Sequence, residues 1–210
     1  MTPWAGSVLW RGACWSAIAV ILGGCGPQPS PPLPSPTPAT SRTIGAATLV
    51  PPYAGAPVVR DPLPVAVVAG DPCTTALTPD QVRRVLGVDV TGRLRPGEAS
   101  GPTCWWENPV TARMIRVAFA TKFRQGLSAV YPARGPETGW VWRELRVAGY
   151  PAVAMTRDPP WHCTVTAGLA DDVAVEVSLV GRPEDGRDTC GAAGQTAELV
   201  VATLAKRAGR

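Results

Sequence analysis

Residues 163–180 read Cys-Thr-Val-Thr-Ala-Gly-Leu-Ala-Asp-Asp-Val-Ala-Val-Glu-Val-Ser-Leu-Val, and they decide the fold. Two mainly apolar runs, 163–169 and 173–180, flank the turn sequence Ala170-Asp171-Asp172. In the second run, valine or leucine occupies every odd position from 173 to 179, which is the period of a strand with one buried face. Two such runs joined by a short turn predict an antiparallel hairpin.

Residues 114–120 show the same alternation, with Ile115, Val117 and Phe119 set against Met114, Arg116 and Ala118. The period of two predicts another strand. Further strands are expected at 104–107, 140–147 and 152–155, with a turn at 149–151.

Helices are expected on both sides of these strands in the sequence. Thr78, Pro79 and Gln81 have the form of a capping box, and Gly87 is a suitable end, so a helix is predicted over 79–86. A weaker helix is expected at 123–131.

The last helix is expected to begin after a cap at Asp188 or Thr189. Its buried stripe is predicted to be Cys190, Ala193, Ala197, Val200 and Leu204. Strands framed by helices predict an α+β domain: a mostly antiparallel sheet with flanking helices on one or both faces.

Four cysteines, Cys73, Cys104, Cys163 and Cys190, lie in this part of the chain. Their even number, without a Cys-x-x-Cys pair, favours two disulfides over a zinc site in an exported protein. Three connectivities are possible. We favour the local pairs Cys73–Cys104 and Cys163–Cys190, each of which would join a helix-bearing segment to a strand.

The first 25 residues look like a bacterial lipoprotein signal peptide. Arg11 precedes an apolar run at 13–22, which is too short to span a bilayer, and the run ends in Leu22-Gly23-Gly24-Cys25. In such lipoproteins the chain is cut before the cysteine, which is acylated, so Cys25 would anchor the protein to the outer side of the cell membrane. The alternative is an ordinary secretory signal in which Cys25 is incidental.

A proline-rich tether is expected next, because residues 27–38 contain seven prolines in twelve positions. The predicted organisation is a signal peptide at 1–24, the lipidated Cys25 and tether at 25–63, and the disulfide-stapled domain at 64–210. The alternative for the proline run is a ligand for a partner domain. Tyr53 and Val58-Val59 could also pack on the domain as an edge strand.

The composition excludes several classes of protein. Of 210 residues, 45% are hydrophobic and 17% are charged, which argues against wholesale disorder. The net charge of +4 is small and spread out, so no nucleic-acid partner is expected. A single histidine excludes sites that need two.

Several motifs occur together in a family order. They are Asp71-Pro72-Cys73, Leu77-Thr78, Leu86-Gly87, Cys104-Trp105-Trp106, Gly149-Tyr150-Pro151-Ala152, Cys163 and Cys190. This set, with the lipoprotein signal and the proline-rich tether, resembles the actinobacterial exported lipoproteins grouped as domain of unknown function 3558. The resemblance covers about 65–206 and implies an exported lipoprotein, without implying an activity.

Candidate catalytic and metal-binding residues are few. His162 could act as a base, but Ser128 lacks the second glycine of a nucleophile elbow, so a structural histidine is favoured. Asp171-Asp172 suits a turn better than a cation site. Glu184, Asp185 and Asp188 could supply oxygen ligands to Ca²⁺, but they form no EF-hand loop, and a solvated loop is favoured. No cofactor and no metal is expected.

The tryptophans are the strongest candidates for binding. Trp105 and Trp106 point to opposite faces of a strand, whereas Trp140 and Trp142 share one. Core packing is the favoured interpretation of these side chains. The alternative is an exposed binding face made of Trp106, Trp140 and Trp142.

We therefore expect a monomeric, non-catalytic module of the cell envelope that binds a protein or glycan partner. A carrier of a small apolar or lipid ligand is the second hypothesis, and an enclosed apolar cavity would favour it. An envelope hydrolase is the least favoured, because no nucleophile, base and acid are placed together by a motif.

Overall fold

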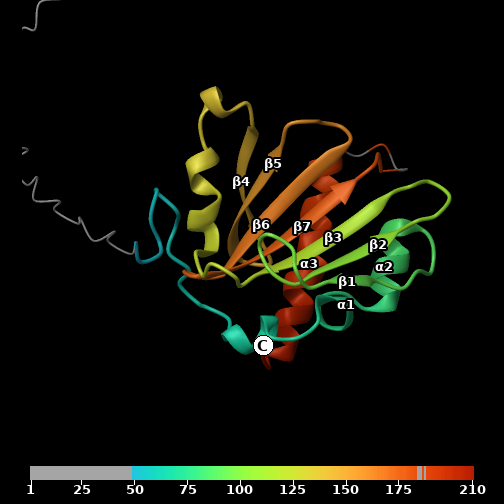
Figure 1. The fold of residues 1–210 in the computed structure, drawn as a ribbon, viewed down its shortest axis with the longest axis horizontal. Helices are drawn as coiled ribbons and strands as arrows, with labels where there is room; N and C mark the ends of the chain where they lie inside the picture. The colour runs from blue at the N-terminus through green and yellow to red at the C-terminus, as the bar shows by residue number, and fades with distance from the viewer. Residues whose placement is uncertain (1–48, 184–185, 187) are drawn as a thin grey trace, which may run out of the picture. The chain divides into compact units, whose positions relative to one another are not determined.

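The computed structural model describes residues 49–183, 186 and 188–210. Its centre is a seven-stranded antiparallel sheet in the order β1-β2-β3-β7-β6-β5-β4 (Figure 1). The strands are β1 (Arg93–Arg95), β2 (Thr103–Glu107), β3 (Met114–Ala120), β4 (Val141–Val147), β5 (Tyr150–Thr156), β6 (His162–Ala170) and β7 (Val173–Val180).

The hairpin expected around residues 170–172 is β6 and β7, at the middle of the sheet. β3 pairs with β7 along its whole length, from Met114 opposite Val180 to Ala120 opposite Ala174. The strands expected at 114–120 and 140–147 are also confirmed, as β3 and β4. β1 was not expected, because two of its three residues lie within residues 94–102, a stretch rich in glycine and proline that favours turns.

The α-helices of the described chain are α1 (Pro72–Thr75), α2 (Pro79–Leu86) and α3 (Thr189–Arg207). The capping box is formed: the Thr78 hydroxyl accepts from the Gln81 N–H, and the Gln81 side chain accepts from the Thr78 N–H. Gly87 ends α2 with φ +76°, a conformation that favours glycine. Asp188 caps α3 by accepting a hydrogen bond from the Gly191 N–H.

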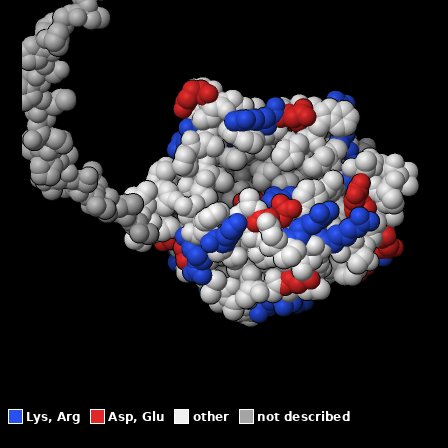
Figure 2. All heavy atoms as spheres, in the orientation of Figure 1, with Lys and Arg blue, Asp and Glu red and all other residues white. Residues whose placement is uncertain are grey.

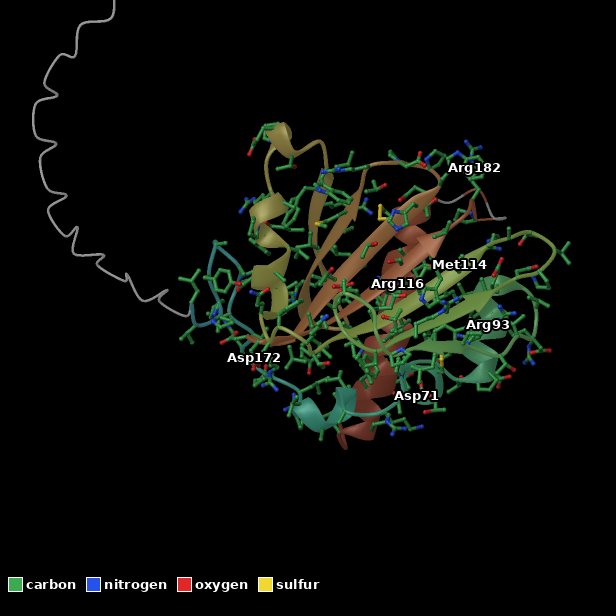
Figure 3. All side chains as sticks on the ribbon, in the orientation of Figure 1. Asp71, Arg93, Met114, Arg116, Asp172 and Arg182 are labelled. Carbon is green, nitrogen blue, oxygen red and sulfur yellow. A yellow bond between two sulfur atoms is a disulfide. The ribbon has the colours of Figure 1, made fainter. Side chains whose placement is uncertain are left out.

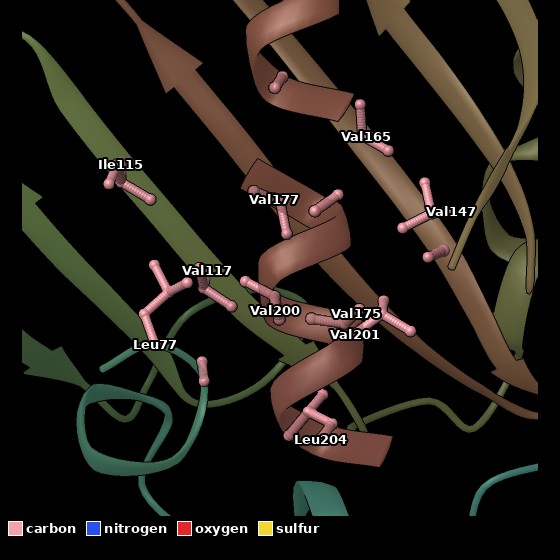
Figure 4. Packing of buried hydrophobic residues seen from close by; sticks show 14 of the residues in the cluster. Leu77, Ile115, Val117, Val147, Val165, Val175, Val177, Val200, Val201 and Leu204 are labelled. Carbon is pink, nitrogen blue, oxygen red and sulfur yellow. The ribbon is translucent and has the colours of Figure 1, made fainter. Parts of the chain in front are cut away.

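α3 packs on one face of the sheet, which we call the closed face (Figure 4). The predicted stripe is confirmed, because Ala193, Ala197, Val200 and Leu204 are fully buried. From the sheet, the closed face contributes Ile115, Val117, Phe119, Val165, Val175 and Val177, all of them also fully buried. This dry contact between α3 and the sheet is the main core of the domain.

Both predicted disulfides are present and lie in this core. Cys73 of α1 bonds to Cys104 of β2, and Cys163 of β6 bonds to Cys190 of α3. Each one joins a helix to a strand, as expected. Such bonds are typical of proteins in oxidising compartments.

The other face, which we call the open face, is covered in part by the segment between β3 and β4, which packs over β5 and β6. Short 3₁₀ turns η2 (Gly126–Ala129), η3 (Tyr131–Ala133) and η4 (Pro136–Thr138) replace the helix expected at 123–131. Leu127 and Tyr131 pack there against Val153 and Met155 in a second small core. Gly168 permits this contact, since a Cβ at that position would meet Leu127 at 3.0 Å.

The folded unit begins earlier than the expected boundary at residue 64. Val59 and Leu63, which lie before that boundary, are buried. The Leu63 N–H donates to the Leu169 carbonyl, and the Val59 N–H donates to Asp171. Residues 49–63 therefore pack on the domain as an irregular segment. A further 3₁₀ turn, η1 (Val65–Val68), follows them.

Candidate functional site

The open face carries one residue from every strand in a single row across the sheet. Directly opposed residues of neighbouring antiparallel strands share a face. The strand registers give the row Arg93, Trp105, Arg116, Ser178, Thr164, Met155 and Trp142, from β1 to β4. Figure 3 shows Arg93, Met114 and Arg116 together on neighbouring strands of this face.

The middle of the row is polar and half-buried. The Arg116 guanidinium pairs with Glu176 of β7 at 3.3 Å, and each side chain is only 18% exposed. Beside it, the hydroxyls of Thr164 and Ser178 are 2.8 Å apart. In Figure 2, this face is hollowed near its centre, and basic and acidic side chains gather there. This half-buried ion pair and the paired hydroxyls distinguish the floor from the apolar closed face.

His162 lies beside this polar floor. Its Nε2 is 3.3 Å from the Thr164 hydroxyl. Burial lowers the pKa of His162 below 6.5, and the positive charge of Arg116 lowers it further, whereas Asp158 acts in the opposite direction. The imidazole is therefore predominantly neutral at pH 7.

Guanidinium groups lie over three of the indole rings. Arg116 is 6.0 Å from the ring centroid of Trp105, Arg157 is 4.4 Å from that of Trp140, and Arg182 is 5.4 Å from that of Trp161. Such cation–π contacts hold an arginine in place while its N–H groups can still donate to an acceptor.

At the β1 end of the row, Trp105 borders a hollow of about 650 Å³. It is lined by Val90, Thr91, Gly92, Arg93, Arg95, Trp105, Glu107 and Pro109. Arg93 and Arg95 are exposed and form no ion pair with any residue that the structure describes. Two unpaired arginines and one aromatic ring make this hollow a candidate site for an anion.

A family model described as protein of unknown function (DUF3558) matches residues 20–203. The chain belongs to this family. No curated protein and no solved structure shows significant similarity to it. The match confirms the family that the set of motifs predicted. The description of the family assigns no activity.

In this DUF3558 chain the alternative of an exposed face made of Trp106, Trp140 and Trp142 is only partly formed. Trp106 is 2% exposed and packs in the main core, so it follows the favoured interpretation of core packing and cannot contribute to a binding face. It stands two residues after Cys104, so it shares the closed face with that cysteine, which α1 covers. Trp105 takes the outward position instead.

Trp140 and Trp142 pack on the second small core and are half-buried. The Trp142 ring meets Tyr131 edge-on, with 5.2 Å between the ring centroids. Burial raises the pKa of Tyr131 above 10.0, and the nearby charge of Glu144 raises it further. The rings of Trp140, Trp142 and Tyr131 together form one wall of the open face.

The remaining candidates are dispersed. The Ser128 hydroxyl is buried and accepts a hydrogen bond from the Tyr53 N–H. It therefore has a structural partner other than His162. Asp171 accepts from the Val59 N–H, and Asp172 pairs with Arg124, so both carboxylates of the β6–β7 turn have structural partners. The described residues contain no group of three side chains placed to hold a metal ion.

Four expectations fall on residues outside the described part of the chain: the signal peptide, the lipidated Cys25, the proline-rich run at 27–38, and Glu184 and Asp185 of the loop before α3. Within residues 49–183 and 188–210, no helix has the length and apolar character that crossing a membrane requires.

The sequence did not predict that four polar residues would come together on the open face, namely Arg116, Glu176, Thr164 and Ser178. The only sequence signal for them is their parity, because each occupies the polar side of an alternating strand. Parity places a residue on a face, but it does not tell which strands become neighbours. The pairing of β3 with β7 brings Arg116 to Ser178 and Glu176, and the pairing of β6 with β7 adds Thr164.

Proposed function

We propose that this DUF3558 protein is a lipid-anchored, non-catalytic module of the cell envelope that binds an envelope component through the open face. The observation that carries the proposal is the contrast between the two faces. α3 and α1 cover one face, whereas the other carries the half-buried Trp105 and the exposed Arg93 and Arg95 beside a hollow. Aromatic and arginine side chains are enriched where proteins bind their partners.

A non-catalytic role is supported by the surroundings of His162. Its hydroxyl neighbour Thr164 is itself paired with Ser178, and among the described residues no carboxylate hydrogen-bonds the imidazole. A hydroxyl nucleophile activated by histidine usually has that histidine oriented by a third group, such as a carboxylate.

The groove between residues 57–61 and the β4–β5 turn, about 860 Å³ in volume, gives no support to a lipid carrier. Arg60, Asp61 and Arg146 line it, and Arg210 ties its two sides together through the Asp61 carbonyl and the Tyr150 hydroxyl. A charged groove of this kind suits a polar ligand better than an acyl chain.

Site-specific photo-crosslinking in the cells that make the protein tests the proposal. A photoreactive phenylalanine replaces Met114, which is half-buried on the open face, or Ala202, which is exposed on α3. The proposal predicts a discrete cross-linked species from position 114 and none from position 202. Equal cross-linking from both positions, or cross-linking from position 202 alone, would refute an open-face binding site.

A further inference from the structure

We propose that the hollow beside Trp105 binds an acidic polysaccharide whose sugar units carry carboxylates, with Arg93 and Arg95 receiving the carboxylates and Trp105 receiving a sugar ring. This inference rests on the proposed function and names the class of ligand that the open face takes.

The charge of the hollow favours an anion. Arg93 and Arg95 line it together with a single acid, Glu107. Both arginines are exposed and lack an ion-pair partner among the described residues, so their donors are available. Guanidinium groups bind carboxylates through two parallel hydrogen bonds.

The spacing of the two arginines favours a chain of anions over a single one. They stand two residues apart on β1 and point to the same face, which separates their Cα atoms by about 7 Å. Each arginine can therefore receive its own carboxylate, as a polymer with repeated charges would supply.

The aromatic ring favours a ligand that also has an apolar surface. Trp105 lies directly opposite Arg93 on the neighbouring strand, and it lines the same hollow. Arg116 stacks on the Trp105 ring from the β3 side, where Glu176 holds its guanidinium. A carboxylated sugar presents a ring with C–H groups next to its charge, so it can use Trp105 and the two arginines together.

The form of the site favours a polysaccharide over an acidic protein. A volume of about 650 Å³ falls in the range of small-ligand sites, roughly 300–1,000 Å³. A stable protein partner covers about 800 Å² of each surface, usually with a larger apolar centre.

The test is calorimetric titration of the full mature protein, purified from cells that export it, with an oligomer of galacturonic acid. Two comparison ligands separate the contributions of charge and ring. The fully methyl-esterified oligomer keeps the rings without the charge, and poly-aspartate keeps the charge without the rings.

We expect the galacturonate oligomer to bind at least about tenfold more tightly than either comparison ligand, since each charged hydrogen bond contributes about that factor. The double substitution Arg93→Gln/Arg95→Gln should weaken binding by about tenfold or more. Trp105→Leu should also weaken it, by several-fold. The matched control Arg84→Gln/Arg207→Gln removes the same charge from exposed positions on α2 and α3 and should leave the affinity within about twofold.

The inference is overturned if the galacturonate oligomer does not bind, if poly-aspartate binds equally well, or if the control pair weakens binding as much as the Arg93/Arg95 pair. The arginine positions are exposed, so loss of folding does not confuse this comparison. If the oligomer fails while position 114 still gives a cross-link in cells, the ligand class is wrong and the proposed open-face function stands.

Discussion

The two faces of the sheet are built from the same strands but are stabilised differently. The closed face is a continuous apolar contact with α3, joined to the helices at both disulfides. The open face has a polar floor, in which Arg116 and Glu176 pair and hydroxyls bond to one another. The comparison indicates that the closed face supplies most of the stability, which leaves the open face available for recognition.

The largest expected effect comes from truncating the closed face. Phe119 is fully buried there, so Phe119→Ala should lower the free energy of unfolding by about 3–5 kcal/mol. The matched change Met114→Ala, on the open face of the same strand, should cost about 1 kcal/mol or less. Urea denaturation of both variants measures the difference, and equal losses would remove the distinction between the faces.

The next largest loss of stability is expected when the disulfide that joins α3 to β6 is removed. Replacing both cysteines in Cys163→Ala/Cys190→Ala should destabilise the fold by roughly 3 kcal/mol, because a cross-link between positions 27 residues apart is lost. Thermal unfolding without reductant measures this change. The same variant should retain open-face cross-linking at low temperature, and loss of that cross-linking in the folded protein would show that the faces are not independent.

A smaller effect is expected from the ion pair on the open face. A double-mutant cycle with Arg116→Met and Glu176→Gln should give a coupling energy of about 1 kcal/mol, because both side chains are largely shielded from water. The pair Arg83–Asp80 on α2 is the control, since its side chains are 53% and 76% exposed, and its coupling should stay below about 0.5 kcal/mol. Equal coupling energies for the two pairs would mean that the hollow does not shield Arg116 and Glu176 from water.

The smallest effect is a dependence of stability on pH. The pKa of His162 in the folded state lies below 6.5, so the unfolded chain binds a proton more readily. The contribution of the neutral His162 to the free energy of unfolding is therefore complete above pH 6.5. It is lost as the pH falls from 6.5 through the folded-state pKa. Unfolding curves at a series of pH values should show a shallower decline for His162→Gln than for the parent, and parallel declines would contradict the assigned shift.

Most of the closed face could be predicted from sequence, because its signals are local. The alternation in residues 114–120 and 173–180, the stripe of α3 and the capping box of α2 each place a residue without knowledge of the topology. The local disulfide pairs were also predicted, since each joins a helix to a strand nearby in sequence.

The open face was harder to predict, because it depends on which strands become neighbours. Arg116 meets Glu176 only through the pairing of β3 with β7, 60 residues apart. Arg93 and Arg95 lie in a strand of three residues, too short to show a period. Trp106 is buried, as core packing predicts, and its parity with Cys104 already argued against the alternative of an exposed binding face.

The central claim, that the open face is the binding surface, is tested most directly by arginine footprinting. The full-length protein is treated with phenylglyoxal in its native envelope and after purification, and modification is followed by mass spectrometry. If the open face is the binding surface, Arg93 and Arg95 are protected in the envelope, while the exposed Arg84 and Arg207 react equally in both states. Protection of Arg84 and Arg207 instead, or of none of the four, would contradict it.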